Sequence, residues 1–387
     1  MTRTIIGRGL LAFVSMLAIV GLAATGARAE EPIRIGSFLA VTGPASFLGD
    51  PEKKTLEMYV EEINANGGVL GRQLELIVYD DGANPQNAVT FAQRLIEQDE
   101  VDVIIGGSTT GTTMAVVPIV EEAEIPFISM GGASVIIDPV RRWVFKTPHT
   151  DRMAVDKVYT DMAMEGISRI GVIAGSGGFD QSCIANAQDL AEGGGMEILS
   201  VETYSRGDTD MTAQLTNIRN QSGLEAVLFC GFGAPAVTVT RNFAQLGFDV
   251  PLYHTHGSAS RRLLEGAGEA ANGVRLPAAA LLVADQLPGA DPQRQPGIAY
   301  ANAYRARYGE DISTFGGHAY DALFLMVEAI EAAGSTDPHA VRGELETLKD
   351  FIGVDGIYNM TTDDHMGLDQ DSFKMVEVRD GDWVFLY

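Results

Sequence analysis

The stretch "VDVIIGGSTTGTTMAVVP", residues 101–118, joins an apolar strand to a helix through a loop of glycine, serine and threonine. Gly106 and Gly111 have the spacing of a phosphate-binding P-loop, with Thr112 where that loop needs its lysine and Thr113 as its hydroxyl. Without the lysine, a nucleotide is a poor fit. Backbone N–H groups at a helix start, together with hydroxyls, suit a carboxylate. An ordinary capped helix explains the loop equally well, because serine and threonine are common N-caps.

The alternation of strand and helix extends along the chain on both sides of this loop. Strands are predicted at residues 33–39, 74–80, 101–105, 169–174, 196–201, 226–230 and 250–254. Helices are predicted around residues 55–65, 88–96, 298–308 and 319–333, and a surface loop at residues 286–297. Strands separated by helices need crossover connections, so we expect two doubly wound, parallel α/β lobes joined near residues 142–148. Ligands collect beyond the carboxyl ends of such strands, which would line a common cleft.

The first 29 residues have the features of an export signal. Arg3 and Arg8 precede an apolar run over residues 10–24, and "ARA", ending at Ala29, is a small-residue cleavage site. A membrane anchor is the weaker interpretation, because the run falls short of about 20 residues and contains Gly21. The sequence therefore predicts a signal peptide over residues 1–29, cleavage after Ala29 and a periplasmic location.

Charge and cysteine content limit the partners and the cross-links. The net charge of −25 becomes −28 once the signal and its three arginines are removed. Such a surface repels nucleic acid and anionic lipid, so neither is an expected partner. Export permits a disulfide between Cys183 and Cys230, but one pair in 387 residues is not a disulfide scaffold. We expect two buried free thiols instead.

Other motifs give no support for a cofactor, a metal or a catalytic site. "CGFGAP", residues 230–235, has the spacing of a dinucleotide fingerprint, but Pro235 more simply marks a helix start. "HTH" places His254 and His256 two residues apart, without a third metal ligand at a recognised spacing. The sequence has no G-x-S-x-G elbow and no H-E-x-x-H motif. We therefore expect no cofactor and no metal, and none of these motifs argues for an enzyme.

Four longer stretches follow one another in a familiar order. They are "RIGSFLAVTGPASFLG" (34–49), "EEINANGGVLGRQLELIVYDD" (61–81), "IIGGSTTGTTMAVVPIVEEAEIPFIS" (104–129) and "GGHAYDAL" (316–323). Together they resemble the periplasmic leucine/isoleucine/valine-binding protein family, the type I solute-binding proteins of ABC importers. The resemblance runs over nearly the whole mature chain.

The resemblance implies the type I periplasmic-binding-protein fold. Residues 30–148 with 280–355 would form lobe 1, and residues 149–279 with 356–387 lobe 2. A three-segment hinge would let the lobes close on a small carboxylate or amino acid. The family further implies a monomer that delivers its solute to an inner-membrane ABC permease. A sensory binding protein that reports to a receptor is the alternative.

Site residues carry over from the family position by position. The carboxylate-binding serine of the family falls on Thr110, which keeps the hydroxyl. The other predicted ligand-binding residues are Leu48, Thr109, Ala133, Ser134, Phe179, Phe232 and His256. Phe179 and Phe232 stand where the family has tyrosines, so the pocket becomes more apolar. Two positions of a disulfide found in some relatives, Ala83 and Thr109, lack cysteine here, so that bridge is absent.

His256 is the departure with the clearest consequence for the ligand. It stands where the family has the acid that pairs with an amino acid's ammonium. A desolvated ammonium needs a carboxylate or several acceptors, and a neutral imidazole offers one. The resemblance therefore predicts a carboxylate ligand without an α-amine, foremost an aromatic acid. A branched-chain amino acid remains the alternative. His318 either packs at a helix start, which we expect, or lines the cleft.

Overall fold

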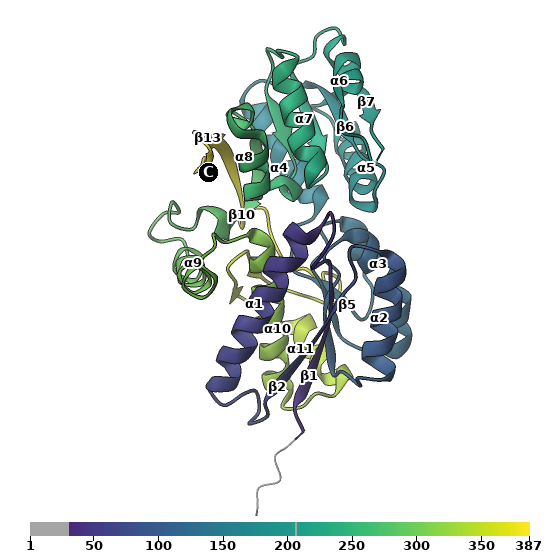
Figure 1. Ribbon diagram of the computed structural model, residues 1–387, viewed down its shortest axis with the longest axis vertical. Helices are drawn as coiled ribbons and strands as arrows, with labels where there is room; N and C mark the ends of the chain where they lie inside the picture. The colour runs from purple at the N-terminus through teal and green to yellow at the C-terminus, as the bar shows by residue number, and fades with distance from the viewer. Residues whose placement is uncertain (1–30, 206) are drawn as a thin grey trace, which may run out of the picture. The chain divides into compact units, whose positions relative to one another are not determined.

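The computed structural model describes residues 31–205 and 207–387, so the predicted signal peptide lies outside the described residues. Within them, the first sheet has five parallel strands in the order β2-β1-β3-β4-β5. Their bounds are β1 Ile33–Leu39, β2 Leu74–Asp80, β3 Val103–Gly106, β4 Phe127–Ser129 and β5 Val144–Lys146. This arrangement agrees with the predicted parallel α/β architecture (Figure 1).

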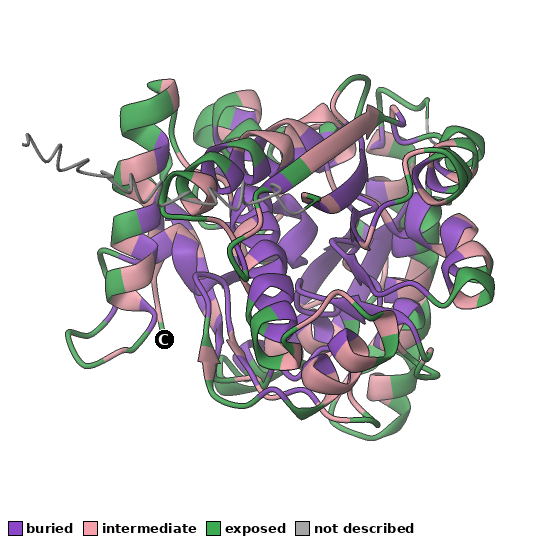
Figure 2. Cartoon of the chain, turned by 90° about the horizontal axis from the view of Figure 1, so that it is seen from below, coloured by how far each residue is buried: buried purple, intermediate pink, exposed green. Residues whose placement is uncertain are grey.

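Helices cover both faces of the first sheet because its strands are apolar on both sides. Val103 and Ile105 of β3 pack into one core cluster, whereas Ile104 between them packs into another. One face carries α1 Ser46–Ala65, α10 Thr314–Ala333 and α11 Pro338–Thr347, and the other α2 Pro85–Glu97 and α3 Thr110–Ala123. Each helix turns its buried side inward and its exposed side outward (Figure 2).

The second sheet, counted over the described residues, has seven strands in the order β14-β13-β10-β9-β8-β6-β7. Their bounds are β6 Arg169–Ala174, β7 Glu197–Thr203, β8 Ala226–Cys230, β9 Leu252–His254, β10 Arg275–Ala279, β13 Phe373–Arg379 and β14 Asp382–Phe385. The prediction of a wholly parallel sheet is wrong at one edge, where β13 pairs antiparallel with β10 and with β14. Asp380 and Gly381 join β13 to β14 with positive φ angles, the requirement of a tight two-residue hairpin turn.

Five helices within the described part of the chain flank this second sheet. They are α4 Asp151–Met164, α5 Gly178–Glu192, α6 Thr212–Arg219, α7 Ala234–Gln245 and α8 Arg261–Ala267. α4 and α5 share one core cluster with the sheet, and α6, α7 and α8 share the other. α7 has a proline in its first turn, as expected for Pro235.

The remaining described elements are one further helix and several short strands and 3-10 turns. They are α9 Arg294–Tyr308, the short strands β11 Phe351–Ile352 and β12 Ile357–Tyr358, and the 3-10 turns η1 Ser134–Ile136, η2 His256–Ser258, η3 Gly268–Ala271 and η4 Ala280–Val283. The surface loop predicted over residues 286–297 is wrong in its last four residues, which already belong to α9. None of the described helices is long and apolar enough to span a bilayer.

Packing places the third connection between the sheets later than the sequence suggests. Tyr358, Met360, Met366 and Leu368 are buried in the core cluster of the first sheet, although the predicted boundary is at residue 355. The chain joins the second sheet only with β13. The division into two hinged lobes itself stays a prediction.

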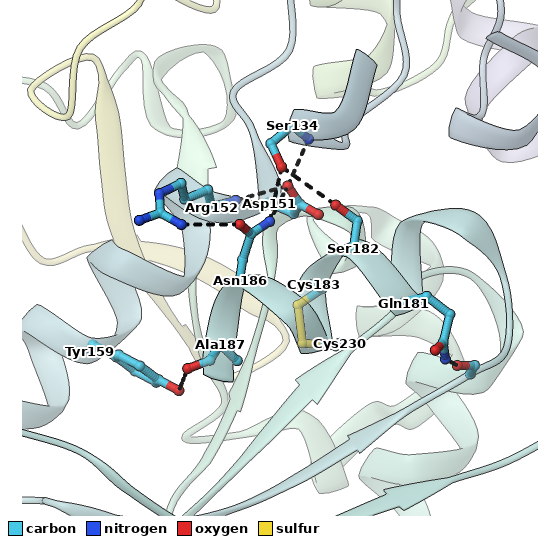
Figure 3. Close-up of a disulfide and its surroundings, with 11 residues drawn as sticks. Ser134, Asp151, Arg152, Tyr159, Gln181, Ser182, Cys183, Asn186, Ala187 and Cys230 are labelled. Atoms are coloured by element: carbon cyan, nitrogen blue, oxygen red, sulfur yellow. Dashed lines mark hydrogen bonds between the residues drawn. A yellow bond between two sulfur atoms is a disulfide. The ribbon is translucent and has the colours of Figure 1, made fainter. Parts of the chain in front are cut away.

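Cys183 and Cys230 form a disulfide, so the prediction of two free thiols is wrong (Figure 3). Side chains alternate along β8, and Cys230 points to the face that α5 covers, together with Ala226 and Leu228. Cys183 is on the buried side of α5, with a Cα–Cα distance of 5.8 Å to Cys230. The thiols meet because α5 packs directly on this strand.

Candidate ligand-binding site

A cavity of about 40 Å³ lies where elements of the two sheets meet. Among the described residues, its lining is Leu48, Ser108, Thr109, Thr110, Met130, Gly132, Pro148, Phe179, Phe232, His256, Gly257, Phe315 and His318. Six of the eight predicted ligand residues are therefore brought together. A volume of this size has room for a few water molecules, so a larger solute requires the walls to move apart.

The start of α3 forms one wall of the cavity, and the glycine- and threonine-rich loop after β3 leads into it. Thr109 caps the helix: its hydroxyl accepts a hydrogen bond from Thr112 N, and the two hydroxyls lie 3.0 Å apart. Gly106 passes so close to β1 that a Cβ atom would lie 2.9 Å from the carbonyl oxygen of Phe38. The glycines therefore let the loop cross the strand, and the cap fixes the direction of the first helical N–H groups.

The hydroxyl of Thr110 has no hydrogen-bond partner among the described residues, although its oxygen is buried. A buried polar atom of this kind is unusual in a folded protein and costs free energy. Thr110 also faces the first residue of α5, since a Cβ on Gly178 would lie 3.6 Å from Thr110 Cγ2. The positive ends of α3 and α5 thus converge on one point, which favours an anion there.

A buried carboxyl group stands behind this wall and was missed by the sequence analysis. Glu52 of α1 accepts a hydrogen bond from the Ser108 hydroxyl, which itself accepts one from Ala40 N. Burial raises the pKa of Glu52 to about 8, so this carboxyl is protonated at neutral pH. A neutral Glu52 leaves the positive potential of the α3 terminus intact.

Aromatic side chains from both sides of the cavity form its apolar walls. Phe179 and Phe232 pack edge to face with ring centroids 5.8 Å apart. Phe315 of α10 also lines the cavity. Phe47 of α1 is not a lining residue, but its ring packs against both neighbours, with centroids 6.4 Å from Phe232 and 5.5 Å from Phe315. Edges and faces of this kind suit a flat apolar guest.

The disulfide links α5, which carries Phe179, to the last residue of β8, just before the loop that carries Phe232. Cys183 follows Phe179 by four residues, about one helical turn along α5, and Cys230 precedes Phe232 by two residues. The covalent bond therefore limits how far these two aromatic walls can separate.

His256 lies in the cavity wall without an acidic partner. Its ring is 5.5 Å from that of Phe179, and no Asp or Glu among the described residues lines the cavity. Its Nδ1 is buried with no hydrogen-bond partner among those residues. Burial lowers the pKa of His256 to about 3, so the imidazole is neutral. As a neutral imidazole it can take part in a hydrogen bond with a ligand without adding charge to the cavity.

The other histidine of "HTH" has a structural role. His254 is fully buried in β9, with Ser258 Oγ 2.9 Å from Nδ1 and Thr240 Oγ1 3.2 Å from Nε2. Both of its nitrogens are occupied. The two imidazoles therefore do not share a site.

Two predicted ligand residues, Ala133 and Ser134, are not among the described residues that line the cavity. Ser134 turns instead toward the start of α4, where its backbone N–H donates to Asp151 (Figure 3). Its hydroxyl accepts a hydrogen bond from Asn186 of α5. The neighbouring Gly132 takes the wall position, and a Cβ there would lie 3.0 Å from both His256 Nε2 and Phe179 Cε2.

Seven lining residues were not predicted as site residues: Ser108, Met130, Gly132, Pro148, Gly257, Phe315 and His318. His318 lines the cavity, contrary to the expectation that it only packs at a helix start. α10 begins at Thr314, five residues earlier than predicted, which places Phe315 and His318 in its first turns. Ser313, the N-cap, is the signal in the sequence that indicates this earlier start.

Comparison with known families gives one match over most of the chain. Residues 32–382 match the family described as periplasmic binding protein. Among curated proteins, the leucine-, isoleucine-, valine-, threonine- and alanine-binding protein of Pseudomonas aeruginosa is 26% identical over 352 residues, covering 88% of this chain and 90% of that protein.

Solved structures have the same fold. An extracellular ligand-binding receptor from Rhodopseudomonas palustris HaA2 superimposes with a TM-score of 0.85 at 28% identity, covering 92% of this chain and 99% of that one. A solute-binding protein of an ABC transporter from Rhodopseudomonas palustris BisB5, in complex with 3,4-dihydroxybenzoic acid, gives a TM-score of 0.78 at 20% identity, covering 92% and 96%.

Proposed function

The chain belongs to the periplasmic binding protein family, as a solute-binding protein of the branched-chain amino acid type of ABC importer, and from that premise we propose that it binds an aromatic carboxylate without an α-amine. The family places it outside the cytoplasm. We further propose that it is exported by a signal cleaved after Ala29, works as a monomer, and hands its solute to an inner-membrane permease rather than transforming it.

The unpartnered hydroxyl of Thr110, at the convergence of two helix N-termini, carries this proposal. A ligand carboxylate would accept hydrogen bonds from that hydroxyl and from the first N–H groups of α3. It would thereby satisfy a buried group that has no partner among the described residues.

The remaining walls favour an aromatic body over an amino acid. Phe179 and Phe232 supply ring edges and faces, and His256 supplies a neutral hydrogen-bonding group. An α-ammonium would be buried without a carboxylate, because no acidic side chain among the described residues lines the cavity.

Known proteins of this fold do not decide between these ligands. The Pseudomonas aeruginosa relative is named for leucine, isoleucine, valine, threonine and alanine, whereas the structure of the Rhodopseudomonas palustris BisB5 protein is a complex with 3,4-dihydroxybenzoic acid. The relative's name keeps a branched-chain amino acid as the second candidate. Our choice of an aromatic acid as the ligand therefore rests on the chemistry of the pocket, which has His256 where the family has an acid.

Calorimetric titration of the mature protein with 4-hydroxybenzoate and with leucine tests the proposal. We expect saturable binding of the aromatic acid and little or no heat with leucine. Tight leucine binding, with no response to the aromatic acid, would contradict it. A thermal-shift assay should give the same ranking of the two solutes, because a ligand that binds only the folded form raises its melting temperature.

A further inference from the structure

A buried acid stands directly behind His318, and this arrangement extends the proposed function to a second contact with the ligand. Nδ1 of His318 lies 2.6 Å from Oδ2 of Asp355. The two side chains are 5% and 0% exposed, respectively. His318 lines the cavity, so the contact at Nδ1 leaves Nε2 as the ring nitrogen available on the cavity side.

The acid is held in place by a second acid on the same helix as the histidine. Asp321 accepts hydrogen bonds from Val354 N at 2.7 Å, from Asp355 N at 3.0 Å and from the Tyr358 hydroxyl at 2.8 Å. It thus fixes the backbone on which Asp355 sits. Neither oxygen of the Asp355 carboxyl group has a hydrogen bond of normal geometry within the described chain, and its polar contact there is the 2.6 Å approach of His318 Nδ1.

Two glycines leave space for the carboxyl groups of Asp355 and Asp321. A Cβ on Gly317 would lie 2.5 Å from each oxygen of Asp355, and a Cβ on Gly353 would overlap the carboxyl group of Asp321. The motifs "GGH" (316–318) and "GVD" (353–355) therefore build one unit, in which glycine lets each acid approach the opposite segment. The contact between His318 and Asp355 is a constructed feature of this cavity wall.

The charge of the His318–Asp355 pair determines whether Nε2 of His318 carries a hydrogen. Two unprotonated lone pairs 2.6 Å apart would repel, so at least one of His318 Nδ1 and Asp355 Oδ2 carries a proton. With that proton alone the buried pair would be an anion beside the acid of Asp321, a costly arrangement. Burial accordingly raises the pKa of Asp355 and lowers the pKa of His318 to about 3. A neutral pair has a second proton, and it resides on Nε2.

We propose that His318, oriented by Asp355, donates a hydrogen bond from Nε2 to a second oxygen of the bound aromatic acid. The inference rests on the proposed function, because it assumes that the carboxylate occupies the Thr110 wall. The ligand class is thereby narrowed to oxygenated aromatic acids. The oxygen is a ring substituent or a carbonyl next to the carboxylate. Asp355 acts as a positioning residue through the imidazole.

Affinity ratios of matched acids test this contact. We would titrate the mature protein with 4-hydroxybenzoate against 4-fluorobenzoate, and with phenylglyoxylate against phenylacetate, with benzoate as the common reference. At least one oxygenated acid should bind about tenfold more tightly than its match, as expected for one hydrogen bond in a buried site. The pair that shows the ratio identifies where the oxygen lies.

Three variants assign the ratio to the proposed residues. His318→Phe and Asp355→Ala should lower it to below about threefold, while Asp355→Asn, whose amide can still donate to Nδ1, should keep it. His365→Phe is the control, because His365 is buried against Phe145 at 4.1 Å between centroids and does not line the cavity. Benzoate affinity and melting temperature, measured on each variant, show that it is folded.

The outcomes separate the two proposals. Two results would overturn the inference and leave the proposed function standing. In the first, benzoate binds but the two acids of each matched pair bind with equal affinity. In the second, the affinity ratio is unchanged in His318→Phe and Asp355→Ala. Failure of every aromatic acid to bind the unmodified protein would overturn both.

Discussion

Replacing Glu52 with glutamine should make folding stability less sensitive to pH. Glu52 is fully buried on α1, and burial raises its pKa from 4.5 to about 8. Between these two pH values the unfolded chain has lost the proton while the folded chain retains it. Stability contributed by the protonated group is therefore complete below pH 4.5 and is lost as the pH rises toward 8. The amide that replaces the carboxyl group in Glu52→Gln has no titrating proton.

The size of the effect follows from the same two pKa values. One pKa unit corresponds to about 1.4 kcal/mol, and titration from pH 5 to pH 8 covers most of the interval. The free energy of unfolding of Glu52→Gln, relative to the unmodified protein, should therefore rise by about 3–4 kcal/mol between pH 5 and pH 8. The glutamine carbonyl can still accept the Ser108 hydrogen bond, so the difference reports mainly on charge.

Urea unfolding at pH 5, 6, 7 and 8, followed by circular dichroism, measures this difference. Glu57→Gln is the matched control, because Glu57 is exposed on the same helix and should change stability by less than about 0.5 kcal/mol at every pH. A difference for Glu52→Gln that stays flat over this range would show that the buried carboxyl is already ionised, and would refute the reasoning.

Three further perturbations test the parts of the site. Replacing both Cys183 and Cys230 with serine should lower the free energy of unfolding by about 4 kcal/mol, because the disulfide closes a loop of 47 residues. The same change should weaken benzoate binding. Unchanged benzoate affinity would show that the disulfide does not hold the aromatic walls of the cavity. Thr110→Val should weaken benzoate binding at least tenfold with the melting temperature unchanged, because its hydroxyl has no partner in the described protein. His256→Glu should abolish benzoate binding and create leucine binding, measured by calorimetry; retained preference for benzoate would contradict the role given to this position.

Periodicity predicted most of the fold because its signals are local. The strands at residues 33–39, 74–80, 169–174 and 226–230 match the structure to the residue, since each is a short apolar run between turn or helix signals. The antiparallel edge formed by β13 and β14 was missed, because strand direction depends on the connection and not on composition. The disulfide was missed for a related reason: alternation gives the face of Cys230, but only tertiary packing tells which helix covers it.

The site was predictable where it follows a chain motif. The resemblance to the family placed Thr109 and Thr110 in the site, and in the structure both lie at the start of α3 in the cavity wall. Glu52 and Asp355 act from behind the lining residues, and their partners Ser108 and His318 are far from them in sequence. No spacing connects such pairs. Ser134 does not line the cavity: Gly132, two residues earlier, holds the wall position, and the Ser134 N–H donates to Asp151 instead.

A crystal structure of the mature protein with bound benzoate or 4-hydroxybenzoate tests the central claim most directly. We expect a carboxylate oxygen within hydrogen-bond distance of Thr110 Oγ1 and of the first N–H groups of α3, with the ring packed against Phe179 and Phe232. A complex in which the acid lies elsewhere, and Thr110 Oγ1 still has no partner, would contradict the account.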